Sequence, residues 1–232
     1  MFEQPEPLSV ARHGDLRLRR VDDFRFAAGE SRVPLVAGEV VEAAKHFPIV
    51  FPVGDEARPV AVLGLEAGAN RFVDGSGQWT AGYLPAHIRR YPFILGRGGG
   101  DTDGQVIMLD PRAPQLDQED GEPLFADTTD GERADLGEAA RAAVDFLRRF
   151  QREADEVPAR FEPLVETGVL VERGLDIKRG GEVVRRIGGI RVVYRERLVA
   201  LDDATLAAWA RDGLLEIVHA HLQSLDNLRR LA

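Results

Sequence analysis

The chain has 232 residues, enough for one domain with a sizeable core, and its 44% apolar and 30% charged residues are typical of a soluble globular fold rather than a disordered or fibrous one. The formal net charge of -9 argues against a nucleic-acid-binding protein that works by neutralising phosphates. The absence of cysteine excludes disulfides, thiolate metal sites and thiol nucleophiles.

A secretion signal has a basic start followed by an apolar stretch. The amino-terminal residues of this chain contain no such apolar stretch. No segment reaches the roughly 18 consecutive apolar residues that a membrane-spanning helix needs. We therefore expect no integral membrane segment and no export by the general secretory route. A cytoplasmic location is expected, and the alternative is the cell surface by a route without a cleaved amino-terminal signal.

The amino-terminal half carries short stretches in which apolar and polar residues alternate, as in half-buried strands. Strands are predicted at residues 16–18, 24–26, 32–38, 49–53 and 59–65. The last two are rich in β-branched residues and flank a turn, so we expect them to form a buried antiparallel pair. Residues 39–45 favour a short helix, because Pro48 discourages its continuation.

The stretch from Asn70 to Leu95 concentrates aromatic and basic side chains. The DGSG turn at residues 74–77 predicts a hairpin with arms at 71–73 and 78–80. Pro85 suits the start of a helical turn that runs to Arg90, and the following Tyr91-Pro92 pair ends it. Strands are predicted at residues 93–95 and 105–109.

Residues 110–138 are rich in Asp, Glu, Pro and Gly, which predicts an exposed connection. A capping pattern at residues 135–138 predicts a helix that runs to about residue 155. The elements expected after it are a helix at 160–167, a hairpin of 170–178 with 182–186, a strand from 190 towards 200, and helices at 202–209 and 214–231, with Gly213 between the last two.

These elements predict an α+β fold, because strand patterns dominate the first half and long helical patterns follow residue 135. A mainly antiparallel sheet in the amino-terminal half would carry the carboxy-terminal helices and the β-hairpin. We expect a β-rich part at residues 1–112, an acidic connection at 113–134 and a helical part at 135–232, all within one compact domain.

The candidate motifs for chemistry have simpler structural interpretations. His219 and His221 are two residues apart, so on a helix they point about 200° from each other and do not readily share a metal ion. The loop at 96–101 lacks the residues of a phosphate loop, and the acidic residues at 117–122 lack the calcium-loop pattern. No serine lies in a GxSxG motif. We therefore predict no catalytic residue, no metal site and no cofactor.

A binding surface is predicted instead at the aromatic and basic stretch. The candidate residues are Asn70, Trp79, Tyr83, His87, Arg89 and Arg90. An arginine would grip a carboxylate of the ligand while an aromatic ring stacks on it. The alternative is that the aromatic residues are core anchors and that Arg89 braces loops. On a helical turn, Arg89 and Arg90 point about 100° apart, so one is expected to brace the fold and the other to be free.

Several motifs in this chain resemble the SapC family. They are HFPIVF at residues 46–51, the residues Asn70, Phe72, Val73, Gly77, Trp79 and Tyr83, the block from Pro85 to Phe93, and HAHLQSLDNLRRL at residues 219–231. This is a bacterial family of about this length, named for a member associated with a paracrystalline surface layer. The resemblance covers nearly the whole chain and implies no catalytic residues.

Three functions are compatible with the sequence. The resemblance implies a non-enzymatic binding or assembly protein that recognises a protein or peptide partner. The second is an enzyme, or the accessory subunit of one, that acts on a small anionic or peptidic substrate. The third is a structural component of a surface layer. A homo-oligomer remains possible, and no nucleic-acid partner is expected.

Overall fold

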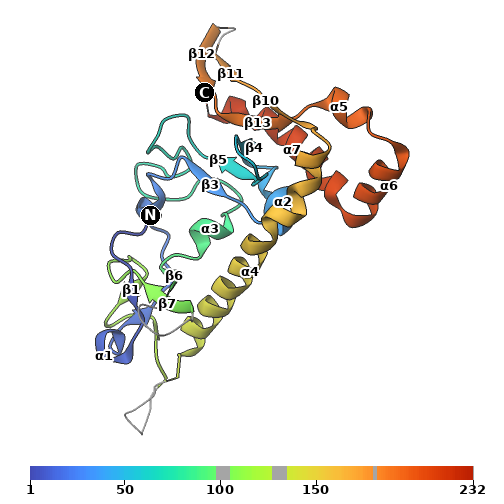
Figure 1. Ribbon diagram of the computed structural model, residues 1–232. Coiled ribbons are helices and arrows are strands. Elements are labelled where there is room, and N and C mark those ends of the chain that lie inside the picture. Colours follow the sequence, from blue (N-terminus) through green and yellow to red (C-terminus); the bar gives the residue numbers. More distant parts are fainter. Residues whose placement is uncertain (98–104, 127–134, 180–181, 232) are drawn as a thin grey trace.

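The computed structural model describes residues 1–97, 105–126, 135–179 and 182–231. The fold is α+β, as predicted. Antiparallel sheets occupy much of the amino-terminal half, and the long helices follow residue 137 (Figure 1). Most of the glycine-rich loop at 96–101, part of the acidic connection and the tip of the predicted hairpin lie outside the described residues.

The main sheet has five strands in the order β10-β13-β4-β5-β3, and every neighbouring pair is antiparallel. Its strands are β3 (Arg32–Pro34), β4 (Ile49–Pro52), β5 (Val60–Val62), β10 (Leu170–Glu172) and β13 (Ile190–Val193). The predicted pairing of residues 49–53 with 59–65 is confirmed, since Ile49 lies opposite Ala61. Because β10 and β13 come from the carboxy-terminal half, the sheet joins the two ends of the chain.

Two smaller sheets form the opposite end of the molecule. One has the order β1-β7-β6 and the other β8-β2-β9. Their strands are β1 (Glu6–Pro7), β2 (Arg17–Leu18), β6 (Phe93–Arg97), β7 (Gln105–Leu109), β8 (Leu116–Asp117) and β9 (Glu122–Pro123), and helix α1 (Val10–His13) lies between β1 and β2. The predicted strands at 16–18, 93–95 and 105–109 are confirmed.

The connection after residue 110 is not simply exposed, contrary to the prediction. Strands β8 and β9 both pair with β2, and Leu124 is fully buried. Leu124 and Phe125 pack with Phe93, Leu109 and Leu147 in a second hydrophobic core. The few large apolar residues of this segment therefore fix it to the smaller sheets.

Helix α4 (Glu138–Glu166) runs along one side of the molecule and connects its two ends (Figure 1). The sequence predicted one helix to about residue 155 and a second at 160–167, and that prediction is wrong, since both lie in the single helix α4, which contains Pro158. The helix continues because its buried residues form one stripe on both sides of Pro158: Ala140, Val144, Leu147, Phe150, Val157, Phe161 and Leu164. The expected cap at Asp135 is also wrong, since Gly137 occupies the cap position.

Three predicted elements near the amino terminus differ in the structure. Residues 24–26 are not a strand, because Arg25–Ala27 form the 3-10 helix η1. Phe24 and Phe26 instead pack against Trp79 and Tyr91 respectively. The hairpin at 71–80 reduces to one antiparallel bridge between Val73 and Trp79. The helix expected at 39–45 appears as the 3-10 helix η2 (Ala37–Glu39) followed by α2 (Val40–Ala43).

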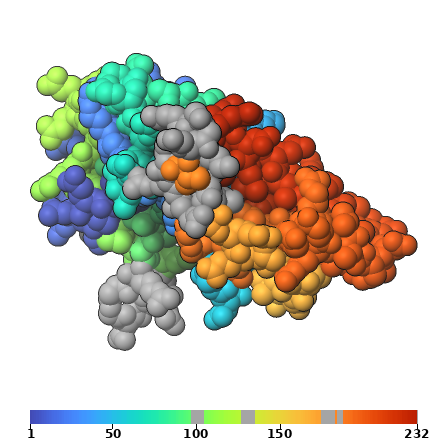
Figure 2. All heavy atoms as spheres, turned by 90° about the horizontal axis from the view of Figure 1, so that it is seen from above, coloured from blue at the N-terminus to red at the C-terminus, as the bar shows by residue number. Residues whose placement is uncertain are grey.

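The carboxy-terminal elements are α5 (Arg195–Val199), α6 (Asp203–Asp212), α7 (Leu214–Ser224) and the 3-10 helix η3 (Leu225–Arg230). The strand expected to run to residue 200 stops at Val193, because α5 begins two residues later. The sequence left the cap of α6 open between Asp202 and Asp203; Asp202 is the cap, and Gly213 ends that helix as predicted, with a left-handed φ of 82°. Helices α5 and α6 project to one side of the molecule in both views (Figures 1 and 2).

The hairpin of β11 (Leu175–Arg179) and β12 (Glu182–Ile187) is confirmed, and it extends from the end of the molecule that holds the main sheet (Figure 1). Leu170–Glu172, which the prediction included in this hairpin, pair with β13 instead. In the described part of the chain, no helix is both long and apolar enough to cross a membrane.

Candidate functional site

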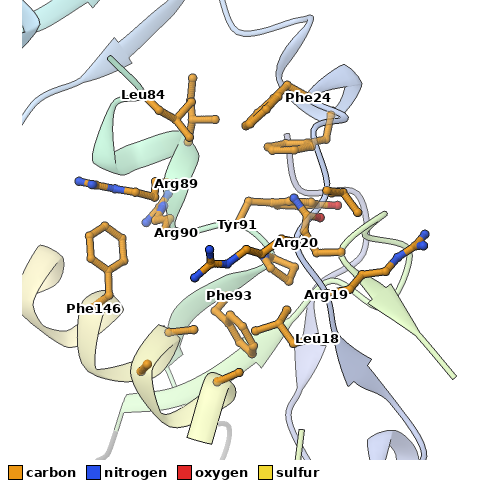
Figure 3. Close-up of a pocket in the computed structure, with 18 of the residues that line it drawn as sticks. Leu18, Arg19, Arg20, Phe24, Leu84, Arg89, Arg90, Tyr91, Phe93 and Phe146 are labelled. Atoms are coloured by element: carbon orange, nitrogen blue, oxygen red, sulfur yellow. The ribbon is translucent and has the colours of Figure 1, made fainter. Parts of the chain in front are cut away.

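A cleft of about 880 Å³ lies between the smaller sheets and helix α4. Its walls come from residues 18–26, the segment 84–93 and the first turns of α4 (Figure 3). Leu18, Phe24, Leu84 and Phe146, all partly exposed, supply apolar surface. A cleft of this volume is in the size range that holds a small molecule or a few residues of a peptide. We call it the arginine cleft, because four arginines line it.

The four arginines come from two distant parts of the sequence: Arg19 and Arg20 follow β2, whereas Arg89 and Arg90 lie at the end of α3 (Ala86–Arg89). Arg19 is neutralised, since its guanidinium lies 3.6 Å from Asp117. Figure 3 shows Arg19 turned away from the centre, whereas Arg20 extends toward Phe146 and Arg90. Within the described residues, the guanidinium groups of Arg20, Arg89 and Arg90 form no hydrogen bond and no ion pair.

Aromatic rings hold the guanidinium groups of Arg89 and Arg90. Arg89 lies over Phe146, 4.7 Å from the ring centroid. Arg90 lies between Phe150 and Phe2, at 5.2 and 5.6 Å from their centroids. The two side chains thus diverge, as their helical positions predict, yet both border the cleft. Such contacts fix the position of a cation and leave its donors available to a ligand.

Arg90 is the more buried of these two cations. Burial lowers the pKa of its guanidinium, an effect that Glu30 partly offsets. Its Nε is one of two buried side-chain polar atoms that have no hydrogen-bond partner in the described residues, and the other is Oε1 of Gln115. Both residues line the arginine cleft. The two residues that carry these atoms with unmet hydrogen-bonding capacity therefore border the same cleft.

Glu39 fixes the start of α3 and hence the positions of Arg89 and Arg90. Its buried carboxylate accepts hydrogen bonds from the backbone amides of Val36 and Ala86 and from the Tyr83 hydroxyl, at 3.0, 2.8 and 2.8 Å. Burial raises the pKa of Glu39, and these hydrogen bonds oppose that rise. Burial, followed by the Glu39 charge, raises the pKa of Tyr83. The amide of Ala86 would otherwise lack a partner at the helix start.

The rim of the cleft also carries acidic side chains. Asp22, Glu122 and Glu138 line it and are exposed. They form no ion pair with Arg20, Arg89 or Arg90 in the part of the chain that is described. The cleft is therefore lined both by arginines that form no ion pair and by exposed carboxylates, and an anionic group that enters it beside the arginines would reduce the repulsion among them.

The structure separates the six binding residues predicted from the sequence. Asn70 is buried, where it donates to Ala27 and accepts from Phe72. The Trp79 indole packs between Phe24 and Phe72 and donates to the Tyr83 carbonyl at 2.8 Å. These contacts are those expected of core anchors.

His87 does not line the arginine cleft but borders another, smaller hollow. This hollow, of about 250 Å³, also borders Arg90 and Phe150, and the His87 ring packs edge-on against Phe150. Burial, followed by the charge of Arg90, lowers the pKa of His87 to about 3. Its imidazole is therefore neutral at physiological pH. Only Arg89 and Arg90 of the six predicted residues line the arginine cleft.

The sequence did not single out Arg20, Phe146 or Gln115 as site residues. Arg20 comes after a predicted strand, and Phe146 lies on the apolar side of a predicted helix. Neither pattern differs from ordinary surface and core positions. Their joint role depends on the packing of α4 against the segment that follows β2.

The two histidines of α7 lie on opposite faces, as their spacing requires. His219 is exposed, whereas His221 is fully buried. His221 Nδ1 donates to the Ile49 carbonyl at 3.0 Å, and its Nε2 accepts from the Val193 amide. Among the described residues, no three His, Asp or Glu side chains are grouped closely enough to bind a metal ion.

Comparison with known proteins adds one finding. The model of the SapC family matches residues 8–231. No curated protein and no solved structure shows significant similarity to the chain. The matched range includes every described residue that lines the arginine cleft.

Proposed function

The chain belongs to the SapC family, and from this premise we propose that it is a non-enzymatic binding protein that recognises a protein or peptide partner through the arginine cleft. The partner inserts an acidic side chain between Arg20 and Arg90 and packs apolar groups on Phe24 and Phe146. One observation carries the proposal: cations from two distant segments line one partly apolar cleft, and three of them, Arg20, Arg89 and Arg90, form no ion pair among the described residues.

Arginine suits this role because its planar guanidinium binds a carboxylate through two parallel hydrogen bonds. The aromatic contacts of Arg89 and Arg90 hold these groups in place before binding, which reduces the entropy lost when the complex forms. Phe24, Leu84 and Phe146, which are partly exposed, supply the apolar area that an acidic group alone does not use. The preferred partner is therefore acidic and apolar within a few residues.

The test is a selection from a phage-displayed peptide library on the folded protein. We expect the selected peptides to contain Asp or Glu beside aromatic or aliphatic residues. Synthetic copies of these peptides should then bind in fluorescence anisotropy measurements, and their affinity should fall when salt is added, since ion pairs at a partly open cleft are screened.

Two variants connect that binding to the cleft. Ala142→Phe places a ring in the cleft from an exposed position on α4 and should abolish binding. Arg20→Gln, at another exposed position, should weaken it about tenfold. The matched control is Ala159→Phe, which changes an exposed alanine of the same helix away from the cleft. The proposal fails if no acidic peptide is selected, or if Ala142→Phe binds as the wild type does.

A second candidate is an enzyme, or an accessory subunit of one, that holds a small anionic substrate in the same cleft. The volume of about 880 Å³ favours it, because small-molecule sites have this size. A selection that yields no peptide, together with thermal stabilisation by small dicarboxylates that Arg20→Gln removes, would favour this alternative.

A further inference from the structure

A second hollow, of about 370 Å³, continues the arginine cleft along helix α4. Arg89 and Phe146 border both spaces, and the guanidinium carbon of Arg89 lies 4.7 Å from the centroid of the Phe146 ring. We call this contact pair, which forms the common border of the two spaces, the saddle. Beyond the saddle, the hollow is bordered by η2, α2 and the next turns of α4. Its sides include Gly38, Arg149 and Glu153. The two spaces therefore lie next to each other along α4, and we call them together the track.

The length of the track follows from the residues of α4 that border it. They extend from Glu138 in the cleft to Glu153 in the second hollow. At 1.5 Å per helical residue, this distance is about 22 Å. An extended peptide advances about 3.3 Å per residue, so about six or seven residues would cover the track.

The two ends of the track differ in charge. The cleft holds the unpaired cations Arg20 and Arg90. At the other end, Glu153 has no ion pair among the described residues, whereas the nearby Glu42 is paired with Lys45. The carboxylate of Glu153 faces the open space beside Gly38, where a Cβ built on the glycine would lie 3.5 Å from its Oε2. The cleft is thus lined by more arginines than carboxylates, whereas the second hollow is lined by more carboxylates than arginines.

We propose that the partner binds as one extended segment of about six or seven residues, with an acidic side chain in the arginine cleft and a basic side chain beside Glu153. This inference rests on the proposed function and adds to it the length, the direction and the charge pattern of the segment. The saddle between Arg89 and Phe146 supports the middle of the segment, where an apolar side chain packs best.

The test uses synthetic heptapeptides built on a sequence selected with the wild-type protein, with Asp near one end and Lys near the other. Shortening the peptide to its Asp-containing half should weaken binding about tenfold. Replacing Lys by Gln in the full peptide should weaken it about fivefold on the wild-type protein and have no effect on the Glu153→Gln variant. The matched control is Glu162→Gln, at an exposed position of α4 that borders neither space.

A blocking variant tests the second hollow by itself. Gly38 is exposed and has no left-handed backbone, and a Cβ there would meet only Glu153 Oε2 within 4 Å, at 3.5 Å, so Gly38→Leu is expected to fill part of the hollow. It should weaken the full heptapeptide about tenfold and leave the Asp-containing half unaffected. Gly188→Leu is the control, because Gly188 is exposed and nothing lies within 4 Å of its Cβ position.

The outcomes separate this inference from the function on which it rests. If Ala142→Phe abolishes binding while Gly38→Leu and Glu153→Gln leave the affinity for the full heptapeptide unchanged, the extended track is wrong and the binding cleft stands. If no peptide binds the wild-type protein, the proposed function itself fails. Should Gly38→Leu melt earlier than Gly188→Leu, the decision rests on Glu153→Gln, which changes only one exposed group.

Discussion

His221 connects two strands of the main sheet through its side chain. It is fully buried, and both ring nitrogens bind backbone groups, one on β4 and one on β13. Donation from Nδ1 and acceptance at Nε2 describe a neutral imidazole, since a protonated ring has no acceptor. Burial lowers the pKa of His221 to about 4. Protonation would therefore break the bond to the Val193 amide.

This gives a prediction for the pH dependence of stability. Between about pH 6.5 and 4 the unfolded chain binds a proton at His221 and the folded chain does not, so the free energy of unfolding falls as the pH falls. The contribution is complete above pH 6.5 and amounts to on the order of 2 kcal/mol between pH 7 and 5.

Urea unfolding at pH 7 and pH 5 measures this change. His221→Gln should lower stability at pH 7 and remove much of the difference between the two pH values. His219→Gln, at the exposed histidine of the same helix, should leave that difference unchanged. An equal pH dependence in the wild type and in His221→Gln would contradict the assignment.

Glu39 gives a second prediction at the residue scale. Glu39→Gln replaces one acceptor oxygen by a donor, which then faces an amide or a hydroxyl that also donates. We expect a loss of about 1 to 3 kcal/mol in the free energy of unfolding. Peptide binding should weaken as well, because α3 carries Arg89 and Arg90. Glu42→Gln is the control, since Glu42 is exposed. Unchanged stability and binding in Glu39→Gln would refute this role.

Residue patterns predict only part of the candidate site. Arg89 and Arg90 stand out in the sequence because they follow Pro85 within an aromatic stretch, and both border the cleft. Arg20 does not stand out, because 63 residues separate it from Leu84 in the sequence and its proximity to α3 is not visible there. Trp79 and Tyr83 are residue types typical of a binding surface. In the structure, however, the Trp79 indole donates to the Tyr83 carbonyl, and the Tyr83 hydroxyl donates to Glu39. That these six residues bind a ligand stays a prediction.

Helix α4 shows why local rules predict the elements only in part. Short strands such as Ile49–Pro52 and the turn at Pro85 follow from residues close in sequence. Pro158 also signals a helix end locally, yet α4 continues for eight residues after it, to Glu166. The cost of an internal proline is about 3 kcal/mol. Burial of Val157, Phe161 and Leu164 in the main core offsets it, and this burial depends on tertiary packing that the local pattern does not reveal.

This explanation predicts the effect of a substitution beyond Pro158. Phe161 is fully buried and packs against Phe51, with ring centroids 5.8 Å apart. Phe161→Ala should lower the free energy of unfolding by about 3 to 5 kcal/mol. Glu162→Ala, at the next and exposed position, should change it by less than about 0.5 kcal/mol. Similar small effects in both would show that burial does not hold this half of the helix.

At the scale of the whole molecule, two structural features connect the ends of the chain. The main sheet takes β3, β4 and β5 from the first half and β10 and β13 from the second. Helix α4 contributes Leu147 to the core around Phe93, and Phe161 to the core of the main sheet. If either the amino-terminal or the carboxy-terminal part unfolded alone, it would expose buried apolar residues of the main sheet or of α4, because both parts pack on these elements.

We therefore predict a single cooperative unfolding transition in differential scanning calorimetry, with equal calorimetric and van't Hoff enthalpies. A heptapeptide that binds the arginine cleft should shift this whole transition to higher temperature, because residues 18–26, 84–93 and 138–146 must all be folded to form the cleft. Ala142→Phe should melt as the wild type does, but without the shift. Two resolved transitions, of which only one moves with the peptide, would mean that the β-rich and helical parts fold separately and that the cleft belongs to one of them.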